Sequence, residues 1–291
     1  MCGAIWKAET KVLNDDARRA ADGSFVMLAH GYTHYQDASV PPARPVVLVH
    51  GFSVPYFIWD PTFCILAEAG LKPLRYDLYG RGYSDRPRVP YDMALFVEQL
   101  CQLLDALGHV EVDLIGLSMG GAIASAFTVT FPDRVRKLVL IDPSGARPID
   151  LGFLYKLAVL PGVSDLVIGI AGTECLLDSA GKGFFDPALI EAFRERYRIQ
   201  MEFRGFKRAI LSTVRHKMLG SFSTTYAQLG RLGTQVLLVW GENDRTVPFE
   251  HSRVLRQLLP EADLLVVPDC GHIPHYERPQ IVNPRLIDFL N

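Results

Sequence analysis

The sequence lacks the charge excess and the cysteine spacing that mark several large classes of protein. Its 291 residues carry a formal net charge of −2, and acidic and basic residues are interspersed. Without a basic stripe to hold a phosphate backbone, nucleic acid is not an expected partner. The five cysteines are scattered and form no C-x-x-C pair, so neither a zinc site nor a redox pair is expected.

A secretory signal and an uninterrupted membrane span are also missing. The N-terminus has no basic region followed by an apolar one, and free thiols fit a reducing compartment, so we expect a cytoplasmic protein. Residues 151–172 are mostly apolar, but Lys156, Pro161 and Asp165 interrupt them. This pattern predicts two amphipathic helices and no transmembrane segment. Docking of these helices on a lipid surface is a further hypothesis.

Apolar runs of strand length alternate with helical stretches from about residue 45 onward. The alternation predicts an α/β fold with a mostly parallel sheet and helices on both faces. Strands disappear between 146 and 230 and return at 235, so we divide the chain into a core, 1–145 and 231–291, and a helical domain, 146–230. The expected strands are 45–49, 72–77, 110–117 and 137–142, the expected helices 59–69, 92–107, 119–131 and 281–290, with an antiparallel pair in 24–36.

The pentapeptide Gly116-Leu117-Ser118-Met119-Gly120 stands between a strand-like run and a helical one. Small residues at its first and last positions let strand and helix approach closely, and the tight turn exposes the serine hydroxyl at the edge of the sheet. The helix that follows turns free N–H groups toward any negative charge that develops there. Ser118 is therefore the candidate nucleophile.

A serine hydroxyl needs an adjacent base, and the base needs a third group to orient it. Asp244 and His272 follow two successive apolar runs, 236–240 and 264–267. Because the carboxyl ends of parallel strands share one edge, both residues are expected beside Ser118. We assign His272 as the general base and Asp244 as the residue that orients its imidazole.

Three carboxylates compete with Asp244 for the orienting role, and one histidine competes for the role of base. Asp142 is the most serious competitor, because it ends a neighbouring apolar run and could reach the same imidazole. His275 follows a proline and should point elsewhere. The remaining carboxylates are Glu242 and Asp269.

An anion-binding loop is expected directly after the run 45–49, at His50-Gly51-Phe52. In this arrangement an oxyanion is held by the amide after the nucleophile and by an amide of that first loop. The expected donors are the backbone amides of Met119 and Phe52. His50 is interpreted as a residue that fixes the loop, because a base is already assigned.

Five motifs together resemble the α/β-hydrolase superfamily, in its branch of capped esterases, lipases and C–C hydrolases. The resemblance implies an eight-stranded, mostly parallel sheet, with the helical domain as a cap that roofs the site, excludes water and selects the substrate. The motifs are His50-Gly51-Phe52, the segment 77–84, the segment 116–121, Gly241-Glu242-Asn243-Asp244 and Gly271-His272.

The resemblance implies a carboxylesterase or lipase-type serine hydrolase that acts on small-molecule esters of short to medium acyl chain. Its acyl-enzyme chemistry needs no metal and no organic cofactor. Haloalkane dehalogenases and soluble epoxide hydrolases of this fold use an aspartate nucleophile, so Ser118 excludes them. C–C hydrolases of ring-fission products usually carry Asn before the nucleophile and Trp after the catalytic histidine, where this chain has Leu117 and Ile273. C–C hydrolysis and ligand reception without turnover are the alternatives.

Overall fold

The computed structural model describes residues 9–38, 44–149 and 164–291. Its centre is one eight-stranded sheet in the order β1-β2-β4-β3-β5-β6-β7-β8. β1 pairs antiparallel with β2, and β2 pairs antiparallel with β4. The remaining neighbours, from β4 through β3, β5, β6 and β7 to β8, all pair parallel. The bounds are β1 Ser24–Leu28, β2 Gly31–Asp37, β3 Pro45–Val49, β4 Lys72–Tyr76, β5 Val112–Leu117, β6 Val135–Ile141, β7 Gln235–Gly241 and β8 Asp263–Val267.

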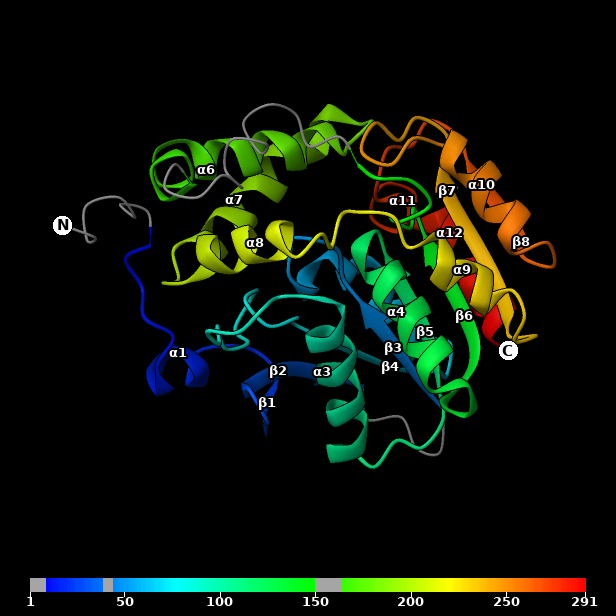
Figure 1. Cartoon of the computed structure of the whole chain (residues 1–291), viewed down its shortest axis with the longest axis horizontal. Helices are drawn as coiled ribbons and strands as arrows, with labels where there is room; N and C mark the ends of the chain where they lie inside the picture. The colour runs from blue at the N-terminus through cyan, green and yellow to red at the C-terminus, as the bar shows by residue number, and fades with distance from the viewer. Residues whose placement is uncertain (1–8, 39–43, 150–163) are drawn as a thin grey trace.

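Both faces of the sheet are buried, as a parallel sheet requires. Alternate residues of β3 show this directly, since Val47 and Val49 belong to one apolar core and Val46 and Leu48 to the other. Figure 1 shows helices on both sides of the strands, with α3 and α4 in front. The first core packs under α3 (Met93–Ala106), α4 (Met119–Thr130) and α10 (Glu250–Leu258), and the second under η2 (Tyr56–Trp59), α2 (Asp60–Glu68), α11 (Pro274–Glu277) and α12 (Pro279–Leu290).

The strand and helix alternation predicted from the sequence is confirmed, and so is the antiparallel pair at its start. The differences lie at element ends. β5 begins at Val112 rather than at residue 110, and β6 begins at Val135 rather than at 137. Element ends are set by a few local hydrogen bonds, which the periodicity of apolar residues does not specify.

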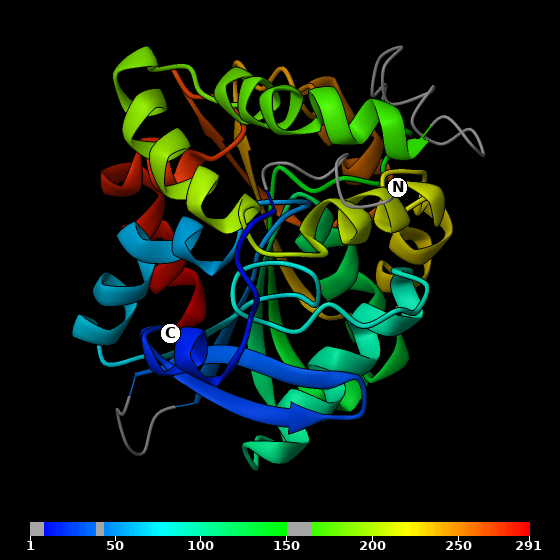
Figure 2. The same ribbon diagram turned by 90° about the vertical axis from the view of Figure 1, so that its left-hand side faces the viewer.

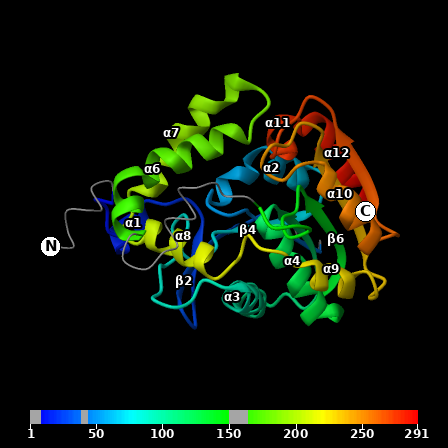
Figure 3. The same cartoon turned by 45° about the horizontal axis from the view of Figure 1, so that its top comes forward.

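Between β6 and β7, where the sequence predicts a helical domain, the described residues form four α-helices. They are α6 (Ser164–Lys182), α7 (Ile190–Met201), α8 (Phe206–Arg215) and α9 (Ser223–Leu229). The first three pack on one another, whereas α9 packs on α4 and α10. Figure 2 shows α6 and α7 gathered beyond one end of the strands, and Figure 3 shows the two helices side by side. The residues 151–163, on which half of the proposed lipid-docking surface depends, lie outside the described residues.

The N-terminal residues of the described chain connect the α6–α8 helices to the core. Lys11 forms an isolated parallel bridge with Phe203, which lies between α7 and α8. The short helix α1 (Asp15–Arg19) follows, and Arg18 pairs with Asp85 of the core at 2.6 Å. Among the described residues, no helix is both long and apolar enough to cross a membrane.

Candidate active site

Ser118 stands at a strained turn between β5 and α4. Its φ of 54° and ψ of −119° lie in a region that non-glycine residues rarely occupy. The glycines on either side leave no room for a side chain, since a Cβ on Gly116 would lie 2.5 Å from the Gly120 oxygen and a Cβ on Gly120 would lie 2.2 Å from the Val49 oxygen. Strain of this kind is retained where the surrounding structure enforces it, and it often marks a functional residue.

His272 and Asp244 form a hydrogen-bonded pair. The imidazole Nδ1–H donates to Asp244 Oδ2 over 2.7 Å, and in a neutral imidazole this tautomer has Nε2 free to accept a proton. The other carboxylate oxygen, Oδ1, accepts the backbone amides of Thr246 at 2.7 Å and Val247 at 2.9 Å. Asp244 is buried and fully engaged, so it holds the imidazole in one orientation and one tautomer.

Asp142 is buried directly beside this pair. Its Oδ1 accepts the Gly241 amide at 3.0 Å, and Asp142, Asp244 and His272 each have a ligand atom within 4.8 Å of the others. Burial and the negative charge of Asp244 raise the pKa of Asp142 well above its ordinary value. Two adjacent carboxyl groups cannot both ionise cheaply, and the raised pKa favours the protonated form of Asp142. Asp142 therefore lies at the site, as a competitor for the orienting role would, but it is Asp244 that accepts the hydrogen bond from the imidazole.

The remaining competitors do not reach the imidazole. Glu242 and Asp269 are exposed. His275 is fully buried, donates from Nε2 to the Ile58 carbonyl at 3.2 Å and packs against the Trp59 ring at an interplanar angle of 37°. Burial lowers the pKa of His275 to about 3, so it stays neutral and acts as a packing residue.

The loop after β3 lies against the serine, as the sequence predicts. A Cβ on Gly51 would lie 3.3 Å from the Cβ of Ser118. His50 is fully buried, accepts the Leu78 amide at Nε2 and donates from Nδ1 to the Gly51 carbonyl, both over 2.9 Å. Burial lowers the pKa of His50 to about 4, which keeps it neutral and suits a residue that fixes the loop.

The two candidate oxyanion donors have no competing acceptor in the described part of the chain. Neither the Phe52 amide nor the Met119 amide makes a hydrogen bond there. The Gly51 carbonyl faces His50, and in a trans peptide the next N–H points the opposite way. The Phe52 amide therefore points away from the His50 ring, which leaves it available to an anion.

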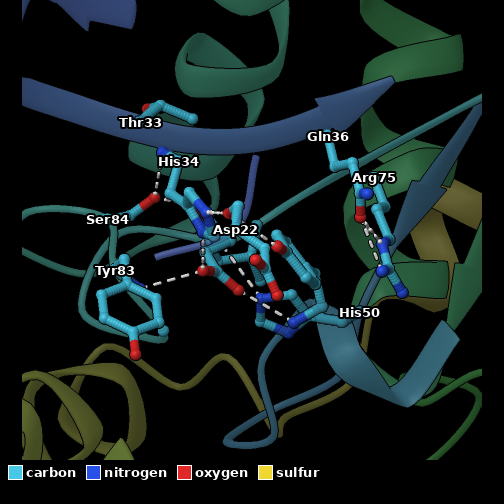
Figure 4. Close-up of polar contacts among 12 residues, drawn as sticks. Asp22, Thr33, His34, Gln36, His50, Arg75, Tyr83 and Ser84 are labelled. Carbon is cyan, nitrogen blue, oxygen red and sulfur yellow. Dashed lines mark hydrogen bonds and ion pairs between the residues drawn. The ribbon is translucent and has the colours of Figure 1, made fainter. Parts of the chain in front are cut away.

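Sequence reasoning missed a buried polar cluster that supports this loop. Asp77, at the end of β4, accepts hydrogen bonds from His34 Nδ1 at 2.7 Å and from the amides of Tyr56 and Tyr83 at 2.8 and 2.9 Å. Burial alone would raise the pKa of Asp77, but the bonds and charge of His34 outweigh it and lower the pKa. Figure 4 shows His34, Tyr83 and His50 gathered in this cluster. His34 belongs to no sequence motif, so its contact with Asp77 is recognised only from the position of β2 in the structure.

The comparisons with known proteins agree with this architecture. The model of the alpha/beta hydrolase family matches residues 46–285, and the chain belongs to that family and is a hydrolase. It is 31% identical over 264 residues to 2-hydroxymuconate semialdehyde hydrolase of Pseudomonas putida, which covers 87% of this chain and 89% of the relative.

Further relatives carry names of the same kind. A 2-hydroxy-6-oxononadienedioate/2-hydroxy-6-oxononatrienedioate hydrolase of Comamonas testosteroni is 28% identical, over 88% of this chain and 90% of the relative. The solved structure of a meta-cleavage product hydrolase from Pseudomonas fluorescens superposes with a TM-score of 0.76 at 25% identity, over 92% of this chain and 97% of the other. An enol-lactonase from Burkholderia xenovorans shares the fold, with a TM-score of 0.77 at 21% identity, over 92% and 99%.

Proposed function

We propose that this hydrolase cleaves a carbon–carbon bond next to a carbonyl group, in unsaturated ring-cleavage products of the kind for which its relatives are named. The observation that carries the proposal is the 31% identity to 2-hydroxymuconate semialdehyde hydrolase over 87% of the chain. The hydrogen-bonded His272–Asp244 pair and the strained turn at Ser118, which both follow strands of the same sheet, support it. This reaction was the alternative interpretation of the sequence, and ester hydrolysis was the main one.

In the proposed reaction the dienol substrate first takes its keto form, as a proton moves from the hydroxyl oxygen to the carbon of the bond that will break. Ser118 Oγ then attacks the carbonyl carbon beside that bond, and its proton passes to His272 Nε2. The amides of Phe52 and Met119 hold the oxygen that becomes negative. The carbon–carbon bond then breaks, its electron pair leaves with the dienol fragment, and His272 returns the proton to that fragment. Water activated by His272 hydrolyses the acyl group from Ser118. These side chains supply each step, so the proposal includes no metal and no organic cofactor.

Ester hydrolysis by the same residues is the second candidate function. Leu117 and Ile273 favour it, because both are buried apolar residues at positions where C–C hydrolases usually carry Asn and Trp. The acyl-enzyme steps are the same, and an alcohol leaves in place of the dienol. Short to medium acyl chains remain the predicted ester substrates.

We also propose that the helices between β6 and β7 act as a cap over this site, within the division 146–230. The His272 amide donates to the Gly183 carbonyl at 2.7 Å, directly after α6. The end of α6 therefore contacts the loop of the candidate base. A cap in this position would control access of a small substrate and exclude water.

Steady-state kinetics on two substrate series test the proposal. Wild type should turn over 2-hydroxymuconate semialdehyde with a kcat/KM about 100-fold above its best p-nitrophenyl ester, a preference of roughly 3 kcal/mol. Ser118→Ala should lose about 10⁴-fold or more in kcat on either series. Ser125→Ala removes another buried hydroxyl of the same region, from α4, and should keep wild-type rates.

Each outcome separates the candidates. Turnover of esters alone would establish the second candidate, and turnover of neither series would favour a ligand receptor. Full activity of Ser118→Ala would reject the assigned nucleophile, whichever substrate is used.

A further inference from the structure

Arg81 is a fully buried cation in the loop after β4. Its Nε and Nη2 donate to the Phe52 carbonyl at 2.8 and 2.6 Å, and its Nη1 donates to the Tyr79 carbonyl at 3.0 Å. Nη2 also donates to Thr213 Oγ1 of α8 at 2.9 Å. All of these acceptors are neutral, and within the described ranges no carboxylate forms an ion pair with this guanidinium.

Burial of an unpaired charge is costly, so the neutral contacts of Arg81 call for an explanation. Burial lowers the pKa of Arg81 to about 10, so the side chain is still protonated at neutral pH. Its guanidinium lies over the Phe96 ring, with 5.4 Å between Cζ and the ring centroid. A neutral residue could fill this volume, but it could not donate two parallel N–H groups to one carbonyl oxygen, as the guanidinium Nε and Nη2 do.

We propose that Arg81 is a positioning residue that fixes the oxyanion peptide of Phe52 to the cap helix α8, so that the anion site is complete only when α8 is in place. The inference rests on the proposed function, since it takes Phe52 as an oxyanion donor. His50 holds the Gly51 carbonyl and Arg81 holds the Phe52 carbonyl, so the two peptide planes on either side of Phe52 are both fixed. The Phe52 N–H lies in the first of these planes, and fixing the second plane limits rotation about Phe52 Cα, which joins the two.

Thr213 provides the link to α8. Its hydroxyl is fully buried, donates to the Ala209 carbonyl at 2.8 Å and accepts from Arg81. A shift of α8 would withdraw this acceptor and leave a buried guanidinium donor unsatisfied, which costs more than the bond itself is worth. The guanidinium would then reorient, and the Phe52 carbonyl would move with it.

Thr213→Val tests the link with little change of shape, and Thr128→Val is its matched control. Thr128 is also a fully buried helical threonine whose hydroxyl donates to the carbonyl four residues earlier, at 2.8 Å, but it lies on α4 and contacts no arginine through a hydrogen bond. Arg81→Lys keeps the charge and removes the two-donor grip on Phe52.

The readout is the rate at which a fluorophosphonate labels Ser118. In this step the bond from Ser118 Oγ to phosphorus forms, the phosphorus–fluorine bond breaks, fluoride leaves and the serine proton passes to His272. The phosphoryl oxygen occupies the oxyanion site, so the rate reports that site whatever the natural substrate is. Ser118→Ala shows whether labelling depends on this serine, and thermal melting shows whether each variant is folded.

We expect Thr213→Val to lower the labelling rate about 10-fold and Arg81→Lys about 100-fold, near the 10²- to 10³-fold loss known for one oxyanion donor. In turnover of p-nitrophenyl acetate the same variants should lose kcat with KM within about 2-fold, since the lost interaction is made in the transition state. Thr128→Val should match wild type in both assays.

Two results would overturn the inference in different ways. If Ser118 is labelled in wild type and both Thr213→Val and Arg81→Lys label at the wild-type rate, the positioning role is wrong and the proposed function stands. If wild type is not labelled at Ser118, the proposed function falls and the inference falls with it. Should Arg81→Lys fail to fold, the comparison of Thr213→Val with Thr128→Val decides alone.

Discussion

Single residues decide the protonation states at the candidate site. Asp244 accepts three hydrogen bonds and holds the imidazole, whereas Asp142 accepts the Gly241 amide with one oxygen and turns the other toward Asp244. A neutral Asp142 can donate its proton to Asp244, so the two carboxyl groups share the site without repulsion. The positive φ of Asp142, 41°, is a further sign that the chain holds this residue against local preference.

Asp142→Asn should change how stability depends on pH. In the folded protein burial and the Asp244 charge raise the pKa of Asp142, so above the ordinary pKa of an aspartate the folded state keeps a proton that the unfolded state has released. This group therefore lowers the free energy of unfolding as pH rises above about 4, by up to about 1.4 kcal/mol per pH unit. Asparagine keeps the acceptor for the Gly241 amide and removes that dependence, so urea unfolding should favour the variant increasingly as the pH rises above about 4.

The exposed Asp133→Asn is the control for this titration, because its carboxyl lies in solvent in both states. It should follow the wild-type profile. Parallel profiles for Asp142→Asn and wild type would mean that Asp142 is ionised in the folded protein, and that the site holds two negative charges.

At the scale of elements, the sequence predicts most of the sheet and little of what joins the helices to it. The runs before Ser118, Asp244 and His272 identify strands whose ends meet, because side-chain periodicity and chain order are local signals. The contacts of Arg81 and His34 join segments that are distant in the sequence, and neither residue type nor spacing reveals them. The N-terminal segment is a similar case, since residues 7–22 carry no motif.

Glu9 shows what this N-terminal segment does for α8. Its Oε2 accepts the Gly205 amide at 2.9 Å and its Oε1 accepts the Lys207 amide at 2.7 Å, so one side chain caps the first turn of the helix. A carboxylate at this end is also favoured by the helix dipole. The Lys11 amide donates to the Glu202 carbonyl and the Lys11 carbonyl accepts the Arg204 amide, both at 2.9 Å. These two bonds hold Lys11 beside the segment between α7 and α8.

Glu9→Gln should loosen α8 locally. The variant loses one anionic oxygen and turns an amide N–H toward a backbone donor, which should cost about 1 kcal/mol, in the range of other N-cap losses. Hydrogen exchange of the α8 amides should quicken about 5-fold, while amides of β5 keep their rates. Glu68→Gln, at an exposed site at the end of α2, should leave both sets unchanged. Equal exchange of α8 in Glu9→Gln and wild type would show that the cap does not limit its opening.

At the scale of the whole molecule, the core and the helices between β6 and β7 meet at the loop of the candidate base. Glu277 of α11 is buried there and accepts the Gly271 amide with Oε1 at 2.8 Å. Its Oε2 accepts the amides of Phe185 and Asp186 at 2.8 and 3.0 Å, directly after α6. One carboxylate thus joins the chain that carries His272 to the end of α6, and neither motif nor periodicity indicated it.

Glu277→Gln should therefore disturb the site and its cover together. Glutamine has one acceptor oxygen, and its N–H₂ would face an amide donor on one side, so about 2 kcal/mol of hydrogen bonding should be lost, in the range for bonds to a charged group. Because the loop of His272 and the end of α6 both loosen, kcat should fall about 10-fold and KM should rise by a similar factor. Steady-state kinetics on the preferred substrate, with the exposed Glu261→Gln as control, measure both. A lower kcat with an unchanged KM would mean that Glu277 supports only the loop of His272. Unchanged values of both would show that this loop and the end of α6 hold their positions without Glu277.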